Sequence, residues 1–190
     1  LVETFDLTGE EWGLGLGCNG VLDVLVEPLD NSLDPALDAL ADGDTAAVLT
    51  VLDSDDDAVG VGARTVLTPH EPRTSSDRRA LPDDAVRALE PVAETAREAG
   101  SNTVETVDRA AGDLQVFVDG ITPVPELLIF GAQHDADAVA DFGARAGLEV
   151  TVASPRGARA DPDYFPHAHH VCATHPTEIA SLVDQPERTY

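Results

Sequence analysis

The chain contains no lysine: all 11 of its basic residues are arginine, against 36 aspartates and glutamates, which gives a formal net charge of -25 over 190 residues. Because no basic stripe exists to neutralise a phosphate backbone, the composition disfavours a nucleic-acid partner. A chain of this charge repels itself in dilute buffer, whereas salt screens it, since the Debye length falls to about 3 Å at 1 M salt. The sequence therefore predicts a protein adapted to a high-salt solvent.

Cysteine is scarce, and long apolar runs are absent. The two cysteines, Cys18 and Cys172, lie far apart in the sequence without CxxC spacing, so free thiols in a reducing cytoplasm are expected ahead of a single disulfide. No apolar run approaches the ~20 residues of a membrane helix, and the N-terminus has neither a basic region nor a hydrophobic signal core. The sequence predicts a soluble, cytoplasmic protein without a membrane partner.

The acidic residues gather most densely in "DSDDD", residues 53–57. A calcium loop of the EF-hand type spaces its carboxylates and ends in a glutamate, which is missing here. We therefore expect a solvated turn at this place and assign most of the acid to adaptation to salt. The composition resembles that of cytoplasmic proteins of salt-accumulating halophilic archaea.

Short runs rich in valine and leucine dominate the first part of the chain, and a hydrophobic content of 43% is enough to fill a core. The runs at 46–53 and 59–67, joined by "SDDDA", predict a β-hairpin. Capping and first-turn residues predict helices at 32–44 and 82–100. Further strands complete a mixed α/β domain over residues 1–121 and are expected at 1–7, 20–29 and 114–121.

A stiff stretch, "TPVP" at 122–125, reads as a linker, since it continues neither a helix nor a strand. Apolar strands alternating with a helix follow it and predict a parallel βαβ unit, the opening of a doubly wound sheet. These elements are expected at 126–130, 134–146, 148–153 and 169–173. The second domain, 126–190, is therefore expected to be Rossmann-like and incomplete at its C-terminus, and we expect the chain to be cut at both ends.

The segment "FGAQHDA", residues 130–136, stands where a dinucleotide-binding turn GxGxxG would lie. Gly131 allows the tight turn, and Ala136 is small enough for the helix to pack closely on the sheet. Gln133 replaces the second glycine, where its side chain would fill the space of a phosphate, and Ser154 replaces the acid that meets the ribose. The positive end of a helix dipole remains. Binding of NAD, binding of another anion and a purely structural turn are all left open.

Three segments, in the right order, resemble the XdhC/CoxI family of maturation factors for xanthine dehydrogenase and related molybdenum hydroxylases. Residues 126–156 resemble the family's "LLIFGAGH" followed by "GxxVTVxDxR". The segment "YFPHAHHV", residues 164–171, is similar to "RFPxAxxV", and "GLGLGCNGVLDVLVEPL", residues 13–29, is similar to "GCGGxxxVLxEPL". The three matches together cover most of the chain.

This resemblance implies a carrier rather than an enzyme. Such a protein would bind the molybdenum cofactor (molybdopterin), help it acquire its sulfido ligand and deliver it to an apo molybdenum hydroxylase of the xanthine dehydrogenase kind. The family's two-domain chains commonly pair, so a homodimer is expected. NAD(P) is a less favoured ligand.

The resemblance also implies which residues bind the cofactor. Cys18 would face the metal or its sulfur, because a thiolate is a soft ligand. Asn19, which replaces a family glycine, tolerates a left-handed backbone, so the turn into Gly20 can survive. The anionic part of the ligand would meet six residues of the second domain, Gly131, Ala132, Gln133, His134, Ser154 and Arg156. No catalytic residue is assigned.

Histidines cluster in "FPHAHHVCATHP", residues 165–176. Alternate residues of an extended run share a face, so His167 and His169 could join in holding zinc. A zinc site also needs a fixed scaffold and a fourth ligand, and the resemblance accounts for this segment as a loop and strand. We therefore assign no metal site here.

Two other functions remain as alternatives. The first is an NAD(P)-dependent oxidoreductase that uses the turn at Gly131, which requires Gln133 to swing away. The second is an interaction domain without any ligand.

Overall fold

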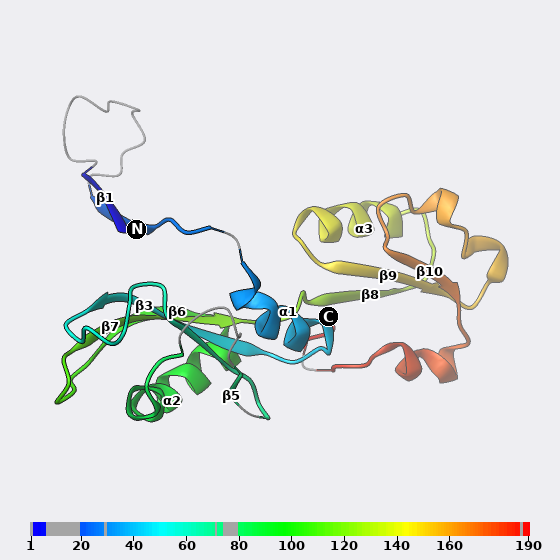
Figure 1. Cartoon of the computed structure of the whole chain (residues 1–190). Helices are drawn as coiled ribbons and strands as arrows, with labels where there is room; N and C mark the ends of the chain where they lie inside the picture. Colours follow the sequence, from blue (N-terminus) through cyan, green and yellow to red (C-terminus); the bar gives the residue numbers. More distant parts are fainter. Residues whose placement is uncertain (1, 7–19, 29, 71, 74–79, 187) are drawn as a thin grey trace. The chain divides into compact units, whose positions relative to one another are not determined.

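The computed structural model describes residues 2–6, 20–28, 30–70, 72–73, 80–186 and 188–190. The chain divides into two compact units, Leu1–Pro123 and Val124–Tyr190. Figure 1 shows the elements of each unit along the chain. Among the described residues, no helix is long and apolar enough to cross a membrane.

An antiparallel five-stranded sheet forms the centre of the first unit, in the order β5-β4-β3-β7-β6 (Figure 1). Its strands are β5 (Pro72–Arg73), β4 (Arg64–Leu67), β3 (Ala46–Ser54), β7 (Leu114–Ile121) and β6 (Asn102–Val107). The hairpin predicted from residues 46–67 is confirmed, although its second strand begins at Arg64. The preceding residues form a turn instead, in which Val59 N–H donates to the Asp56 carbonyl at 2.9 Å and Gly62 N–H donates to the Val51 carbonyl at 2.8 Å.

Strand β6 was not among the predicted elements. Its sequence NTVETV carries polar residues on both faces, and burial alternates weakly along it until Val107. It lies at the edge of the sheet and pairs only with β7 among the described strands. An edge strand needs little apolar surface, so its sequence carries no apolar run that would mark it as a strand.

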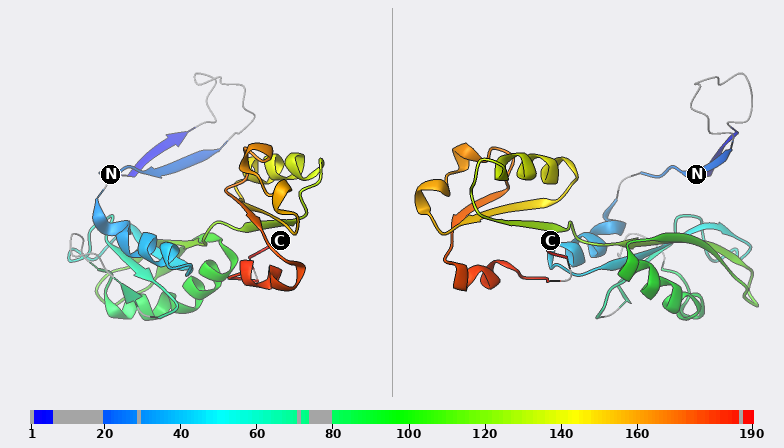
Figure 2. Two further views of the ribbon diagram at one scale, coloured as in Figure 1. Left: turned by 90° about the vertical axis from the view of Figure 1, so that its right-hand side faces the viewer. Right: turned by 180° about the vertical axis from the view of Figure 1, so that it is seen from behind.

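Helix α2 (Asp83–Ala99) covers one face of this sheet (Figure 2). Its sequence places acids in the first turn and Gly100 after the last, where φ is +58°, so the helix predicted at 82–100 is confirmed. Alternate residues of β3 and β7 face the helix and form the main core with it. The fully buried side chains of this core include Leu49, Val51, Ala85, Leu114, Val116 and Val118.

The opposite face of the sheet carries a second, smaller core. Helix α1 (Asp34–Ala41), preceded by a 3-10 turn at Asn31–Leu33, packs Ala36 and Ala39 on Ala46, Val48 and Val66. A separate two-stranded hairpin, β1 (Val2–Asp6) with β2 (Val21–Leu25), precedes this helix. Among the described residues of the first unit, no other helix packs on this face.

Arg109 bonds to two carboxylates of the first unit. Its side chain donates to Asp56 and to Asp84 at 3.0 Å each. The pKa of Asp56 lies below its usual value of 3.8, chiefly because Ala58 N–H and Arg109 donate to its carboxylate. The pKa of Asp84 is lowered too, chiefly by Arg109.

We expect Arg109→Gln to lower the thermal unfolding midpoint near neutral pH. Since the folded pKa values of both acids are lowered, their stabilising contribution is present above pH 3.8 and is lost as the pH falls through the folded values. The deficit of the variant should therefore shrink in acid, as followed by circular dichroism at several pH values. Arg87→Gln changes an exposed arginine of α2 and should show no such dependence.

The second unit is a parallel three-stranded sheet in the order β10-β9-β8, with helix α3 (Ala136–Arg145) packed on it. The strands are β8 (Glu126–Phe130), β9 (Glu149–Ser154) and β10 (His170–Ala173). Their apolar side chains, with Ala136, Ala140 and Phe165, form its core. The prediction of a mixed α/β domain followed by a Rossmann-like domain is confirmed.

Two contacts explain how this unit packs. Gly143 lets α3 approach the sheet, because a Cβ there would lie 2.5 Å from a methyl group of Leu127. On the other edge of β8, Tyr190 N–H donates to the Glu126 carbonyl at 2.9 Å, and Leu128 N–H donates to the Tyr190 carbonyl at 3.0 Å. Strand β8 therefore has neighbours on both sides, as the first strand of a doubly wound sheet does.

Candidate functional site

The turn after β8 is held open by a glycine. Gly131 has φ +125°, a conformation that side-chain-bearing residues rarely adopt, and its N–H donates to the Ala153 carbonyl at 2.8 Å. The bond fixes the turn against the end of β9, and no atom lies within 4 Å of the position of a Cβ on Gly131. The backbone at this point is accessible to a ligand.

Helix α3 begins directly after this turn without a side-chain cap. Asp135 precedes its first residue and makes no capping bond, and Ala136 N–H donates to the Gln133 carbonyl at 3.1 Å. The first N–H groups of a helix lack acceptors within the helix and carry the positive end of its dipole. The start of α3 therefore suits an anionic group.

A cavity of about 680 Å³ lies at this turn, and we call it the turn cavity. Its size is within the range of small-molecule sites. Arg159 supplies the cation of the lining, and its guanidinium reaches the Ala132 carbonyl at 3.4 Å. The remaining lining residues are Ala132, Gln133, His134, Asp137, Ala138, Ala158, Tyr164 and Phe165.

Three of the predicted site residues meet in the turn cavity. Ala132 is buried, whereas Gln133 and His134 are exposed, so the side chain of Gln133 has room to turn into solvent. Gly131 lies beside them in the turn. The sequence reasoning missed Arg159 and Tyr164, which come from the connection between β9 and β10 and carry no recognisable spacing relative to the glycine turn.

Ser154 and Arg156 do not line the turn cavity. Ser154 is 3% exposed, and its hydroxyl accepts from Arg156 N–H at 3.2 Å, which fixes the turn after β9. Arg156 is exposed at the surface. Arg159, three residues further on, stands in the place that the sequence suggested for Arg156.

Three histidines of the second unit make local contacts. His169 Nδ1 accepts from Val150 N–H at 2.9 Å, and His170 Nε2 lies 3.3 Å from Glu149. His167 Nε2 lies 3.7 Å from Asp141. In the part of the chain that the structure describes, no three histidine, cysteine or acidic side chains gather as metal ligands would.

The predicted cysteine turn is described only in part. Cys18 and Asn19 lie outside the described residues, and Gly20, with open space where a Cβ would be, directly precedes β2. Cys172 is a free, half-buried thiol whose sulfur lies 3.4 Å from the Thr174 hydroxyl. It does not line the turn cavity.

The second unit is thus defined as a Rossmann-type domain with a cavity at the glycine turn that is suited to an anionic ligand. Residues 127–186 match the family model described as the XdhC Rossmann domain. The match includes the turn and Arg159, and it supports an XdhC-like family for the chain.

Among solved structures, the chain is similar to one described as a xanthine dehydrogenase from Bacillus halodurans, with a TM-score of 0.72 and 19% sequence identity. The match covers 99% of this chain and 52% of that one, so the chain spans about half the length of the solved relative. At this identity the likeness shows a shared fold. No curated protein matches the chain significantly.

Proposed function

We propose that this protein is a carrier of the molybdenum cofactor that aids its sulfuration and its insertion into an apo hydroxylase of the xanthine dehydrogenase kind. The observation that carries the proposal is the match of residues 127–186 to the XdhC Rossmann domain, because it covers the turn cavity. The similar solved structure, described as a xanthine dehydrogenase, points to the same system.

The turn cavity fits the anionic end of such a cargo. A phosphate can accept hydrogen bonds from the first N–H groups of α3 and from the Arg159 guanidinium. Asp137 opposes it with one negative charge in the first turn of the helix. The open backbone at Gly131 and the exposed side chain of Gln133 leave space for the group.

The cargo would supply the molybdenum centre, and this chain would hold it and keep water from it. Cys18 is proposed to face the metal or to pass a sulfur atom, as its resemblance to the family cysteine implies. Tyr164, which is 63% exposed and lines the turn cavity, can cover a bound group.

We expect the full chain, purified in molar salt from cells that make molybdopterin, to retain the cofactor. Cys18→Ala should lower the retained amount about 10-fold, whereas Cys172→Ala, which removes the other thiol, should leave it unchanged. The measurement is the fluorescence of the oxidised pterin released per mole of protein. An empty wild-type protein would contradict the proposal, and equal content in wild type and Cys18→Ala would remove the role of Cys18.

A pair of arginine variants tests the turn cavity itself. Arg159→Gln should reduce cofactor retention about 10-fold, since a charge-assisted bond to a phosphate is worth about 1.5–3 kcal/mol. Arg156→Gln removes the same charge from a side chain outside the cavity and should have little effect. If Arg156→Gln lost more cofactor than Arg159→Gln, Arg156 and not Arg159 would bind the anionic group.

A nicotinamide cofactor could occupy the same turn. Calorimetric titration with NAD(H) and NADP(H) in molar salt separates the two functions. Heat of binding that disappears in Arg159→Gln, together with a wild type free of molybdopterin, would favour the oxidoreductase.

A further inference from the structure

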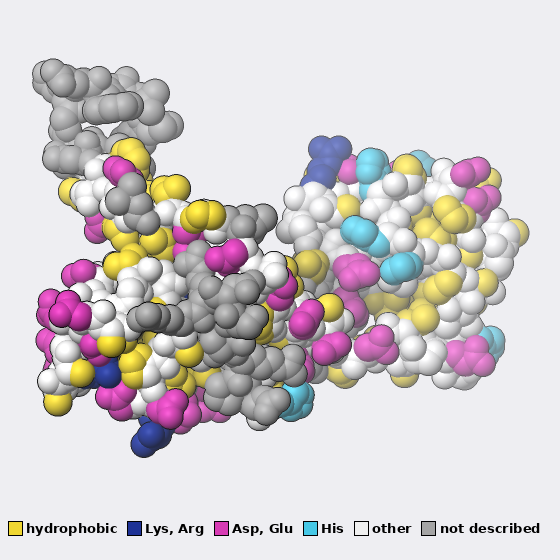
Figure 3. Space-filling view, viewed as in Figure 1, with side chains coloured by type: hydrophobic (Ala, Val, Ile, Leu, Met, Phe, Trp, Pro, Cys, Tyr) yellow, Lys and Arg dark blue, Asp and Glu magenta, His cyan; other side chains and the backbone are white. Residues whose placement is uncertain are grey.

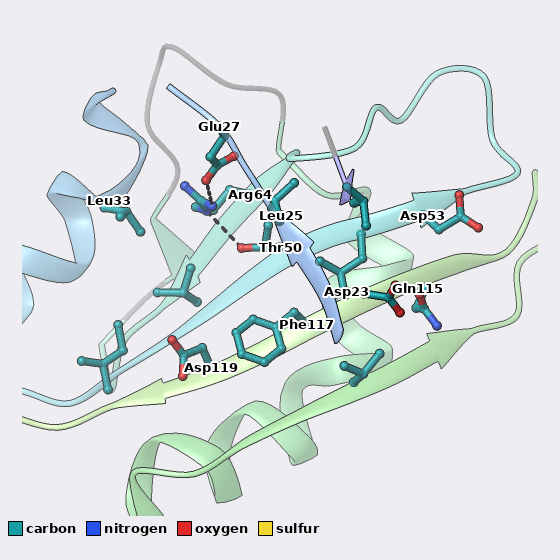
Figure 4. Close-up of a pocket in the computed structure, with 15 residues that line it drawn as sticks. Asp23, Leu25, Glu27, Leu33, Thr50, Asp53, Arg64, Gln115, Phe117 and Asp119 are labelled. Atoms are coloured by element: carbon teal, nitrogen blue, oxygen red, sulfur yellow. Dashed lines mark hydrogen bonds and ion pairs between the residues drawn. The ribbon is translucent and has the colours of Figure 1, made fainter. Parts of the chain in front are cut away.

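A second cavity, in the first unit, is larger than the turn cavity. It has a volume of about 960 Å³ and lies on the sheet face opposite α2; we call it the sheet cavity (Figure 4). Alternate residues of β7 form part of its floor, namely Gln115, Phe117, Asp119 and Ile121. Hairpin residues Val2, Asp23 and Leu25 line another side.

The charges of the sheet cavity disfavour an anionic ligand. Its lining includes the carboxylates of Asp23, Asp53 and Asp119. Its cation, Arg64, is already bonded to the Glu27 carboxylate and to the hydroxyls of Ser32 and Thr50. Figure 3 shows acidic side chains spread over the visible face of the first unit. A neutral ligand that donates hydrogen bonds therefore suits this cavity, and a phosphate does not.

Asp119 is the acceptor on the floor of the sheet cavity. Among the described residues, no group forms a hydrogen bond or ion pair with its carboxylate. Partial burial raises the pKa of Asp119 above its usual value of 3.8, because water around the carboxylate is reduced. A ligand with two adjacent N–H donors would satisfy both oxygens at once.

Phe117 lies two residues before Asp119 on β7, so both side chains project from the same face of the sheet (Figure 4). Phe117 pairs with Thr50 on β3 and with Val104 on β6, and these neighbours also line the sheet cavity. An aromatic ring among aliphatic side chains offers a flat stacking surface. Beside the carboxylate, it selects for a planar ring.

We propose that the sheet cavity binds a planar 2-amino-4-oxopyrimidine ring, with its two adjacent N–H donors on the Asp119 carboxylate and its face on Phe117. Pterin and guanine both present this donor edge. This proposal rests on the proposed function in one respect: a carrier of molybdopterin would meet a pterin ring, because molybdopterin contains one. A bound divalent cation is disfavoured, because no three metal-ligating side chains gather among the described residues.

The test is equilibrium binding to the full chain in molar salt, with pterin, guanosine and adenosine as separate probes. Adenosine is the control, because its ring lacks the pair of donors. We expect pterin and guanosine to bind, because both present the pair of donors. Adenosine should bind at least about 10-fold more weakly than pterin. No binding of pterin or guanosine at about 1 mM, or adenosine binding as tightly as both, would overturn the proposal.

Two matched variants locate the ring. Asp119→Asn should weaken pterin binding about 10-fold or more, because it replaces one acceptor with a donor. Asp53→Asn removes the same charge from another lining residue and should change the affinity by less than about 2-fold. Equal losses in both variants would show that only the overall charge matters and would overturn the assignment. Circular dichroism confirms that both variants fold.

The test of the ring site can fail or succeed independently of the test of the carrier function. Arg159→Gln changes a residue of the second unit that does not line the sheet cavity, so it should leave the binding of free pterin unaltered. Pterin binding together with a failure to retain molybdopterin would contradict the proposed function alone. Retention of molybdopterin by a protein that binds neither free pterin nor guanosine would contradict the ring site alone.

Discussion

Gly120→Ala is expected to destabilise the first unit by about 3 kcal/mol or more. Gly120 lies on β7 under the end of α2, and a Cβ there would lie 1.9 Å from the Ala96 carbonyl oxygen and 2.2 Å from its carbon. No rotamer relieves this clash, because the atoms it meets belong to the helix backbone. The helix or the strand must shift, and the core between them opens.

The matched control is Gly60→Ala, in the turn before β4. Gly60 has open space around the position of a Cβ, and its φ is not positive. Chemical denaturation in molar salt should give the control nearly the wild-type midpoint and Gly120→Ala a much lower one. A fall of less than about 1 kcal/mol in Gly120→Ala would mean that the backbone of α2 does not approach Gly120 closely.

The sequence predicted the elements with strong local signals. Strands with continuous apolar runs, such as β3, β7 and β8, lie within a few residues of their expected positions. So does helix α2, which has acids in its first turn and a glycine after its last. It missed β6, since an exposed edge strand carries no apolar run. The close approach at Gly120 also could not be foreseen, because it depends on how a helix and a strand from distant parts of the chain pack.

In the candidate site, too, only the residues with a local sequence signal could be predicted. A strand, a glycine and a helix in succession predict the glycine turn, so the places of Gly131, Gln133 and His134 follow from the sequence, while their binding roles stay a prediction. Arg159 was missed, because the irregular chain between β9 and β10 brings it to the turn and no periodicity describes such a path. The sheet cavity was also missed, since its floor consists of alternate residues of a strand whose other face fills the core.

The largest polar effect is expected for Arg64→Ala. Arg64 is 7% exposed, and its guanidinium donates to Glu27 at 2.5 Å, to Ser32 at 2.6 Å and to Thr50 at 3.0 Å. These partners come from three places, the segment after β2, the turn before α1, and β3. Arg64 is the buried end of a pair whose glutamate is 22% exposed, so we expect its removal to cost about 2–3 kcal/mol, mainly through the lost charge-assisted bonds to Glu27, Ser32 and Thr50.

An exposed pair of the same chemistry provides the comparison. Arg145 and Asp141 lie one turn apart on α3 at 2.8 Å, and the arginine side chain is 71% exposed. Arg145→Ala should cost less than about 0.5 kcal/mol, and less still in molar salt, where such pairs are screened. Most of the deficit of Arg64→Ala should persist as salt rises, because the arginine end of this pair is buried and salt screens partly buried pairs less than exposed ones. If both deficits vanished together with salt, Arg64 would be a screened surface contact and not the buried centre of a hydrogen-bond network.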